Sequence, residues 1–183
     1  TAREGADLAR SLADTTEQTT VWLPRVTPLP NPHLSRIRDR HVGGDRIVVT
    51  LCEYPRHMYR LLSAPAAARF PLHRATVVEY VDRLSPAMRS NVILRSYPAD
   101  HGWSPMPPSL AALPHEFPGG GATAWQWHQR ARLAVVTYPD PTFIEALALN
   151  APTIGIWRRD LWGMHPEAQT AFDSLAEAGI VHN

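Results

Sequence analysis

Lysine is absent from this 183-residue sequence, and all 18 of its basic side chains are arginine. Any bound anion must therefore be held by arginine, histidine or backbone N–H groups, and lysine-nucleophile or Schiff-base chemistry is excluded. The sequence has a single cysteine, Cys52, which rules out internal disulfides and a cysteine-based zinc cluster. Because Cys52 ends an apolar run, we interpret it as a small core residue rather than as a nucleophile paired with His57.

Several other common signals are missing. No apolar run is long enough to span a membrane, and the chain does not open on a signal peptide. Neither a Gly-x-Gly-x-x-Gly nor a Gly-x-x-x-x-Gly-Lys motif occurs, which disfavours classical dinucleotide binding and P-loop hydrolysis. The net charge of +1, without a long basic stripe, disfavours a nucleic-acid partner. We therefore expect a soluble cytoplasmic protein that needs no cofactor and no metal.

The length is that of one ordinary domain with appendages. In residues 1–40, alanine and leucine spacing over 5–18 predicts a helix, and the four prolines of 21–32 predict an extended linker. The domain proper is expected to occupy residues 41–183.

Apolar runs alternate with helical patterns through that domain. Runs rich in β-branched residues predict buried strands at 46–52, 91–96, 133–137 and 153–157. Helices are expected at 72–84, at 124–130 and from Pro141 onward. This alternation predicts an α/β, Rossmann-like domain with three or four parallel strands and helices on both faces. The loops after the strands should then meet at one carboxyl edge, where such folds bind ligands.

The loop after the first strand carries Arg56, His57, Tyr59 and Arg60 within five residues. Two guanidiniums and an imidazole so close together suit a pyrophosphate, although a solvated basic loop fits the same pattern. His57 is alternatively a candidate catalytic acid or base, since its unperturbed pKa lies near neutrality.

The second loop begins with Arg95 at the end of an apolar strand. Burial of an unpaired guanidinium is costly, so Arg95 should face Asp100, Glu53 or a ligand phosphate. The adjacent Asp100 and His101 do not predict a metal site, because neighbouring loop residues seldom share a metal ion. Trp103 could stack on a base, although packing against the prolines of the loop is commoner.

The third loop opens a helix with Thr142 near its start and Glu145 one turn further on. The free N–H groups of a helix N-terminus bind anions, and a carboxylate beside them can accept the two hydroxyls of a ribose. An acid that merely complements the helix dipole is the competing interpretation.

Four elements in order carry a more specific signal. They are Tyr54-Pro-Arg-x-x-Tyr-Arg-x-x-Ser-Ala-Pro65, Leu94-Arg-x-Tyr-Pro-x-Asp-x-Gly-Trp103, Thr142-x-x-Glu-x-Leu-Ala-x-Asn-x-Pro-Thr153 and Trp157-x-x-x-x-Trp162. Residues 30–183 thereby resemble a family of transferases assigned to surface-carbohydrate biosynthesis. The C-terminal half of that family is similar to GT-B glycosyltransferases and CDP-glycerol glycerophosphotransferases.

The resemblance implies a donor-binding domain of GT-B C-terminal type, acting on a nucleotide-activated sugar or polyol phosphate. Its motif positions here are Arg56, Tyr59, Arg60, Arg95, Asp100, Thr142 and Glu145. It also implies that an acceptor-binding N-terminal half is missing, so that this chain alone should be inactive and should meet that half or a second copy. The Pro- and Gly-rich loop 104–121 departs from the family pattern, and the strand expected before the 124–130 helix is hard to see.

The alternative is a non-catalytic domain that binds a nucleotide or a partner chain. Its interface would use tryptophans that look exposed in the sequence, namely Trp22, Trp125, Trp127 and Trp162.

Overall fold

The computed structural model describes residues 41–57, 65–97, 99–116, 122–139, 141–164 and 166–182. The helix expected at 5–18, the linker at 21–32 and the domain boundary at residue 40 lie outside the described residues. Tyr59 and Arg60 also lie outside them.

Within the described residues, six strands form one all-parallel sheet in the order β3-β2-β1-β4-β5-β6. The strands are β1 (Ile47–Thr50), β2 (Val92–Arg95), β3 (His115–Glu116), β4 (Leu133–Val136), β5 (Thr153–Ile156) and β6 (Val181–His182). The expected α/β, Rossmann-like fold is confirmed, and its four expected strands are β1, β2, β4 and β5. The estimate of three or four strands was too low, because β3 and β6 are two residues long and carry no periodic signal.

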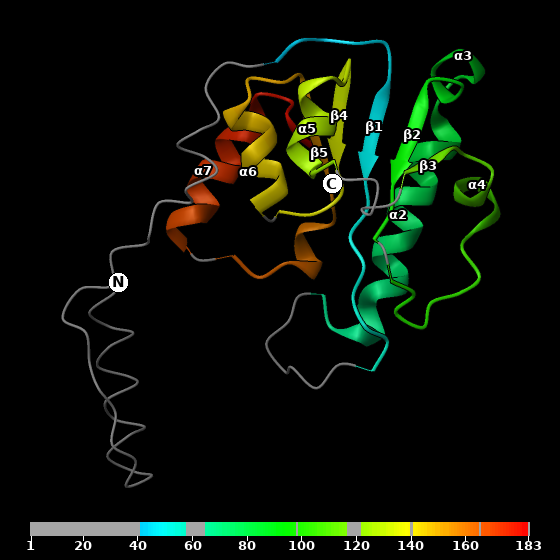
Figure 1. Cartoon of the computed structure of the whole chain (residues 1–183). Coiled ribbons are helices and arrows are strands. Elements are labelled where there is room, and N and C mark those ends of the chain that lie inside the picture. The colour runs from blue at the N-terminus through cyan, green and yellow to red at the C-terminus, as the bar shows by residue number, and fades with distance from the viewer. Residues whose placement is uncertain are drawn as a thin grey trace, which may run out of the picture. The chain divides into compact units, whose positions relative to one another are not determined.

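Helices cover both faces of the sheet (Figure 1). One face carries α2 (Phe70–Arg83) and α4 (Pro108–Ala111), and the other carries α5 (Ala124–Gln129), α6 (Pro141–Ala148) and α7 (Pro166–Glu177). The remaining short elements are η2 (Ala67–Arg69), α3 (Pro86–Arg89) and η3 (Arg159–Leu161). None of the described helices is long and apolar enough to cross a bilayer.

The central strands are apolar because both of their sides are covered. All four residues of β1 are buried, and strictly alternating polarity would not fit such a position. Val49 and Leu94 pack with Val77 and Val81 beneath α2, while Val136 packs with Phe143 beneath α6. The two cores therefore pin the crossover helices to opposite faces of the sheet.

The helix α7 was not expected from the sequence. Its inward side is contributed by residues such as Phe172 and Leu175, which pack against the core on the α6 face. The helix leads through Gly179, whose φ of 71° lies in the left-handed region, into the edge strand β6.

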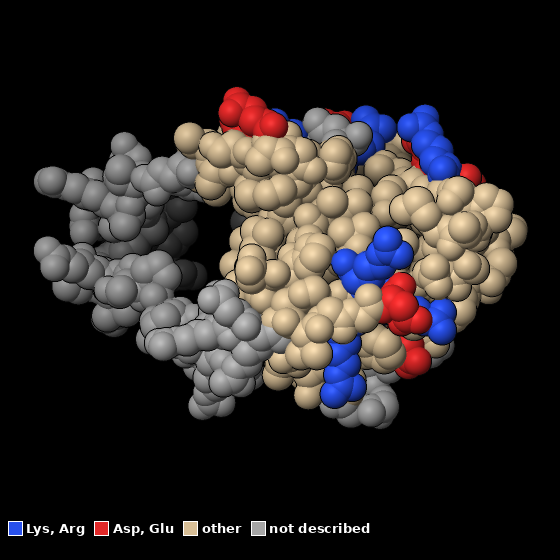
Figure 2. All heavy atoms as spheres, turned by 90° about the horizontal axis from the view of Figure 1, so that it is seen from above, with Lys and Arg blue, Asp and Glu red and all other residues tan. Residues whose placement is uncertain are grey.

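Figure 2 looks onto the amino edge of the sheet, where basic and acidic side chains lie interspersed among uncharged residues. Arg89, for example, bonds to Asp82 across the turn between α2 and α3. The carboxyl edge, described below, lies at the opposite end of the strands.

Gly155 in β5 provides a test of packing on the α6 face. A Cβ added there would overlap the buried ring of Trp157 and lie 3.2 Å from Phe143. We therefore expect Gly155→Ala to lower the free energy of unfolding by about 1–3 kcal/mol, the usual cost of overpacking. Gly163→Ala is the matched control, because nothing lies within 4 Å of its added Cβ. Urea unfolding of both variants measures the difference, and equal stabilities would contradict the described packing.

Candidate functional site

The strand order determines where a ligand can enter the sheet. From β1 the chain crosses to β2 over the α2 face, whereas from β4 it crosses to β5 over the α6 face. The connections therefore diverge between β1 and β4, and in open parallel sheets ligands bind outside the carboxyl ends of the strands at that point. The candidate site is the carboxyl edge around the ends of β1, β2 and β4, as the sequence predicted.

Thr137 joins β1 to β4 where the regular ladder ends. Its hydroxyl donates to the Thr50 carbonyl at 3.0 Å and accepts from the Cys52 N–H at 3.2 Å. Both bonds are buried, so the two strand ends are held at fixed separation beneath the site. Cys52 lies in the core, as expected.

Arg95 ends β2 opposite Thr50 and is half-buried, with an Nε that has no hydrogen-bond partner. Burial lowers the pKa of this guanidinium, and the nearby Tyr138 and Glu145 oppose that shift. Asp100 and Glu53 are not among the groups that influence Arg95, whose pKa responds to Tyr138, just after β4, and to Glu145 of α6. The reason is strand alternation: Arg95 faces the α6 side of the sheet, while the next residue, Ser96, bonds to His115 at 3.0 Å. The third expected partner, a ligand phosphate, stays a prediction.

His128 of α5 lies behind Arg95. It is fully buried, and its Nε2 bonds to the Thr50 hydroxyl at 2.8 Å while its Nδ1 has no partner. Burial and, to a smaller extent, the charge of Arg95 lower the pKa of His128 to about 4. His128 is therefore neutral at pH 7, and Arg95 is the cationic group at this point.

Thr142 and Glu145 lie on α6, on the other side of the same edge. The Tyr138 hydroxyl donates to Thr142 Oγ1 at 2.9 Å, which ties the end of β4 to the start of the helix. Glu145 lies beyond the first turn of α6. The macrodipole acts mainly within the first turn, so dipole complementation explains this carboxylate poorly.

Arg56 lies with the loop after β2. Its N–H donates to the His101 carbonyl at 2.9 Å, and its guanidinium lies over the Trp103 ring at 5.9 Å. The Trp103 indole donates to the Tyr54 carbonyl at 2.6 Å. Trp103 thus packs between the loops that follow β1 and β2, and its expected packing against the prolines of its own loop stays a prediction. His57 is exposed at the last described position of its loop, and its catalytic role stays a prediction.

Asp100 is occupied inside its own loop. Its two carboxylate oxygens accept from the Gly102 N–H and from the Ser104 hydroxyl, each at 2.8 Å. These bonds hold the pKa of Asp100 below its usual value. The turn at residue 102 requires a glycine, because its φ of 87° lies in the left-handed region and an added Cβ would lie 3.3 Å from the Arg56 side chain. Asp100 therefore shapes this loop, and a substrate contact stays a prediction.

An aromatic cluster connects three of the four sequence elements singled out above, and its Tyr138 bonds to Thr142 of the remaining one. Trp162 stacks on Tyr138 with 6.4 Å between ring centroids and lies 6.1 Å from Tyr54. The cluster comprises Tyr54, Phe70, His73, Trp103, Tyr138 and Trp162. Trp162 is buried, so its expected exposure was wrong.

The two arginines after β5 do not extend a basic site. Arg158 bonds to Asp160 at 2.9 Å, and Arg159 bonds to Asp173 of α7. Each is charge-compensated by a nearby carboxylate. Among the described residues, no group of three or more His, Cys, Asp and Glu side chains could hold a metal ion.

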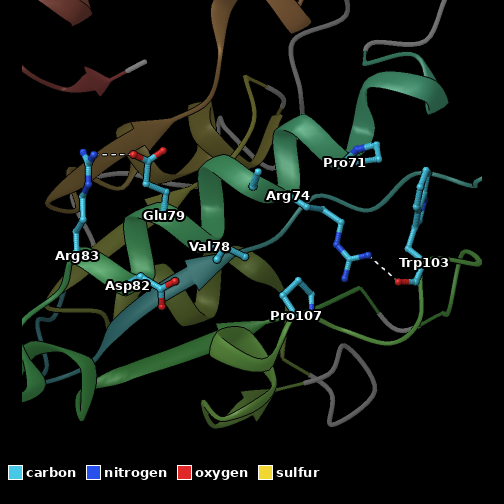
Figure 3. Close-up of a pocket in the computed structure, with 9 residues that line it drawn as sticks. Pro71, Arg74, Val78, Glu79, Asp82, Arg83, Trp103 and Pro107 are labelled. Carbon is cyan, nitrogen blue, oxygen red and sulfur yellow. Dashed lines mark hydrogen bonds and ion pairs between the residues drawn. The ribbon is translucent and has the colours of Figure 1, made fainter.

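Glu53 is a residue that the sequence analysis treated only as a partner for Arg95. It is half-buried, and burial raises the pKa of its carboxyl, while Arg74 and His101 oppose the shift. Arg74 extends from α2 and donates to the Trp103 carbonyl at 2.6 Å (Figure 3). The same face of α2 borders an open groove of about 720 Å³ that passes Val78 and reaches Pro107 (Figure 3).

The aromatic cluster generates a prediction on pH. Burial lowers the pKa of His73 to about 4, whereas an unfolded histidine titrates near 6.5. Between these values the unfolded chain binds the additional proton, so His73 lowers stability as pH falls from 6.5 to 4 and has no such effect above 6.5. The full effect is about 3 kcal/mol. In urea unfolding, His73→Phe should lose less stability than the parent over this window, and the exposed His182→Ala should follow the parent. Parallel curves for His73→Phe and the parent would contradict the assignment.

Comparison with protein families matches residues 17–183 to the LIC12162 family transferase. No curated protein and no solved structure matches the chain. Because the match spans most of the sequence, and the fold around it is a parallel α/β domain with its candidate site at the carboxyl edge, the chain belongs to the LIC12162 family of transferases.

Proposed function

We propose that this domain binds the nucleotide-activated donor of a glycosyltransferase-like enzyme, with a sugar or polyol phosphate as the group to be transferred. The observation that carries the proposal is the placement of Arg95 and Glu145 together at the point where the strand order diverges. One supplies a permanent cation for phosphate, and the other a carboxylate for the ribose hydroxyls. Membership of a transferase family supports a group-transfer reaction.

In this proposal the diphosphate lies beside Arg95 and the start of α6. Free N–H groups at a helix N-terminus favour negative charge there, and the Arg95 Nε has no hydrogen-bond partner among the described residues. As the bond to the transferred group breaks, negative charge grows on the leaving group, which is a nucleoside diphosphate in sugar transfer and a nucleoside monophosphate in polyol phosphate transfer. A guanidinium already in position stabilises that charge without reorganisation. Arg56 is a further candidate contact for the anion, and His57 remains the candidate base for the acceptor. Arg60 lies outside the described residues, and its contact rests on the resemblance alone.

We place the acceptor in another domain or in a second copy of the chain that covers this edge. Three apolar side chains there support a covering surface, since Leu72 is 44% exposed, Tyr97 49% and Ile144 41%. Exposed residues of this size at one edge are typical of interaction surfaces. A domain that lacks its acceptor side should bind donor without turning it over, because it cannot orient the acceptor. We further propose a cytoplasmic role in surface-carbohydrate biosynthesis.

Glu145 tests the ribose contact. If its carboxylate accepts two hydroxyl hydrogen bonds, Glu145→Gln should weaken nucleotide binding by about 1.5–3 kcal/mol. Calorimetric titration of UDP, CDP, GDP and dTDP into the parent chain first identifies the preferred nucleotide. Glu177→Gln, an exposed carboxylate at the end of α7, is the control and should bind like the parent. Equal affinities for Glu145→Gln and the parent would remove Glu145 from the site.

Arg95 tests the phosphate contact separately. Arg95→Met keeps the length of the side chain and removes its charge, so affinity for the preferred nucleoside diphosphate should fall about tenfold or more. Affinity for the nucleoside itself should change little. Stability should be maintained, because a half-buried guanidinium with an unpaired Nε gives way to an apolar side chain. Arg46→Met, at the start of β1 on the amino edge, is the control, and equal losses for nucleoside and diphosphate would contradict a phosphate role.

A further inference from the structure

A small cavity lies beside the proposed nucleotide site, at the carboxyl ends of β1 and β2. It measures about 180 Å³, and its lining includes Glu53, Arg74, Ser96, Tyr97, Asp100 and Trp103. These residues come from the loops after β1 and β2 and from α2. Hydrogen bonds join the three segments, because Arg74 of α2 donates to the Trp103 carbonyl and the Trp103 indole donates to the Tyr54 carbonyl. The walls of the cavity are thus held in place before any ligand binds.

Among the residues that line the cavity, Glu53 has a partly buried carboxyl for which the described contacts give no structural reason. Its carboxyl is half-buried, and burial is the largest influence on its pKa, which is raised. In the described part of the chain, its side chain takes part in no hydrogen bond and no ion pair within 4 Å. A desolvated carboxyl in a cleft without such a partner is a common mark of a ligand site, since a ligand donor can offset the cost of burial.

The other polar groups lining the cavity narrow the ligand class. An ionised carboxylate only accepts hydrogen bonds, and the nearby guanidinium of Arg74 only donates them. A ligand with hydroxyl groups can bond to both side chains, because each hydroxyl both donates and accepts. The cavity is below the roughly 300 Å³ at which pockets for larger organic ligands begin, so its size suits one sugar ring or a short polyol.

The position of the cavity relates it to the donor. Ser96 lines it, and the preceding residue, Arg95, faces the opposite side of the sheet, where the phosphates are proposed to lie. The cavity and Arg95 therefore share the carboxyl end of β2, and a group attached to phosphates at Arg95 would have to extend past that strand end to enter the cavity.

We propose that this cavity binds the hydroxyl-bearing group of the donor, a sugar or polyol, and that Glu53 accepts hydrogen bonds from its hydroxyls. The proposal rests on the proposed function, because the nucleotide at Arg95 and Glu145 positions the group that enters the cavity. Glu53 thereby becomes the residue that distinguishes a complete donor from the bare nucleoside diphosphate.

Calorimetric titration of matched ligands tests the proposal with the 183-residue chain. Each nucleoside diphosphate is compared with its conjugates, for example UDP with UDP-glucose and CDP with CDP-glycerol. For the conjugate that binds best, Glu53→Gln should raise the Kd about tenfold or more, while the Kd of the corresponding diphosphate stays within about twofold. Glu79→Gln is the control, because this carboxylate lies on α2 and bonds to Arg83 at 2.6 Å.

A second variant tests the cavity without changing Glu53. Ala99 is exposed and lines the cavity, so Ala99→Phe should block the cavity without disturbing the core and should cause the same selective loss. The inference is overturned if the diphosphate binds, Glu145→Gln weakens it, and both cavity variants bind the conjugates like the parent. It is also overturned if no conjugate binds the parent more tightly than its diphosphate. Absence of all nucleotide binding would instead overturn the proposed function, and this inference with it.

Discussion

The position of β1 between β2 and β4 is the constraint on which the rest of this structure depends. The two neighbours of β1 lead to helices on opposite faces of the sheet, so the connections move apart at the carboxyl edge, where open parallel sheets bind their ligands. Thr137 prevents the strands themselves from separating, because its hydroxyl bonds to backbone groups on either side of Leu51. A rigid floor beneath an open edge is the arrangement that a binding site requires.

Arg95 differs in its surroundings from the two arginines that follow β5. Arg158 and Arg159 are compensated by carboxylates of their own segment or of α7, and such exposed pairs contribute little to stability. Arg95 is half-buried at the end of a strand, where the protein leaves its Nε without a partner. A chain without lysine has few other ways to hold an anion, and His128 behind it stays neutral at pH 7. This half-buried cation supports the phosphate contact proposed above.

The aromatic cluster gives the loops of the edge their order. Trp103 holds the Tyr54 carbonyl through its indole N–H and packs against Phe70, while Trp162 connects Tyr54 to Tyr138. These contacts place groups from separate loops before a ligand arrives, which reduces the entropy lost on binding. The described aromatic residues of the loops that follow β1, β2, β4 and β5 therefore pack together at this edge.

The sequence by itself determined the fold class, because the β-branched runs of β1, β2, β4 and β5 and the pattern of α2 are strong local signals. It also placed Arg95, Thr142 and Glu145 at one edge, since parallel strands all end there. Only the tertiary structure decided what each residue faces. The two-residue strands β3 and β6 are too short to show a sequence pattern, and they form because they pair with β2 and β5. Trp162 is buried by aromatic rings that are distant in the sequence. Alternation along β2 turned Arg95 toward α6 and away from Asp100, and packing of two loops on α2 enclosed Glu53. Burial and pairing depend on contacts between segments far apart in the chain, and a local pattern does not contain them.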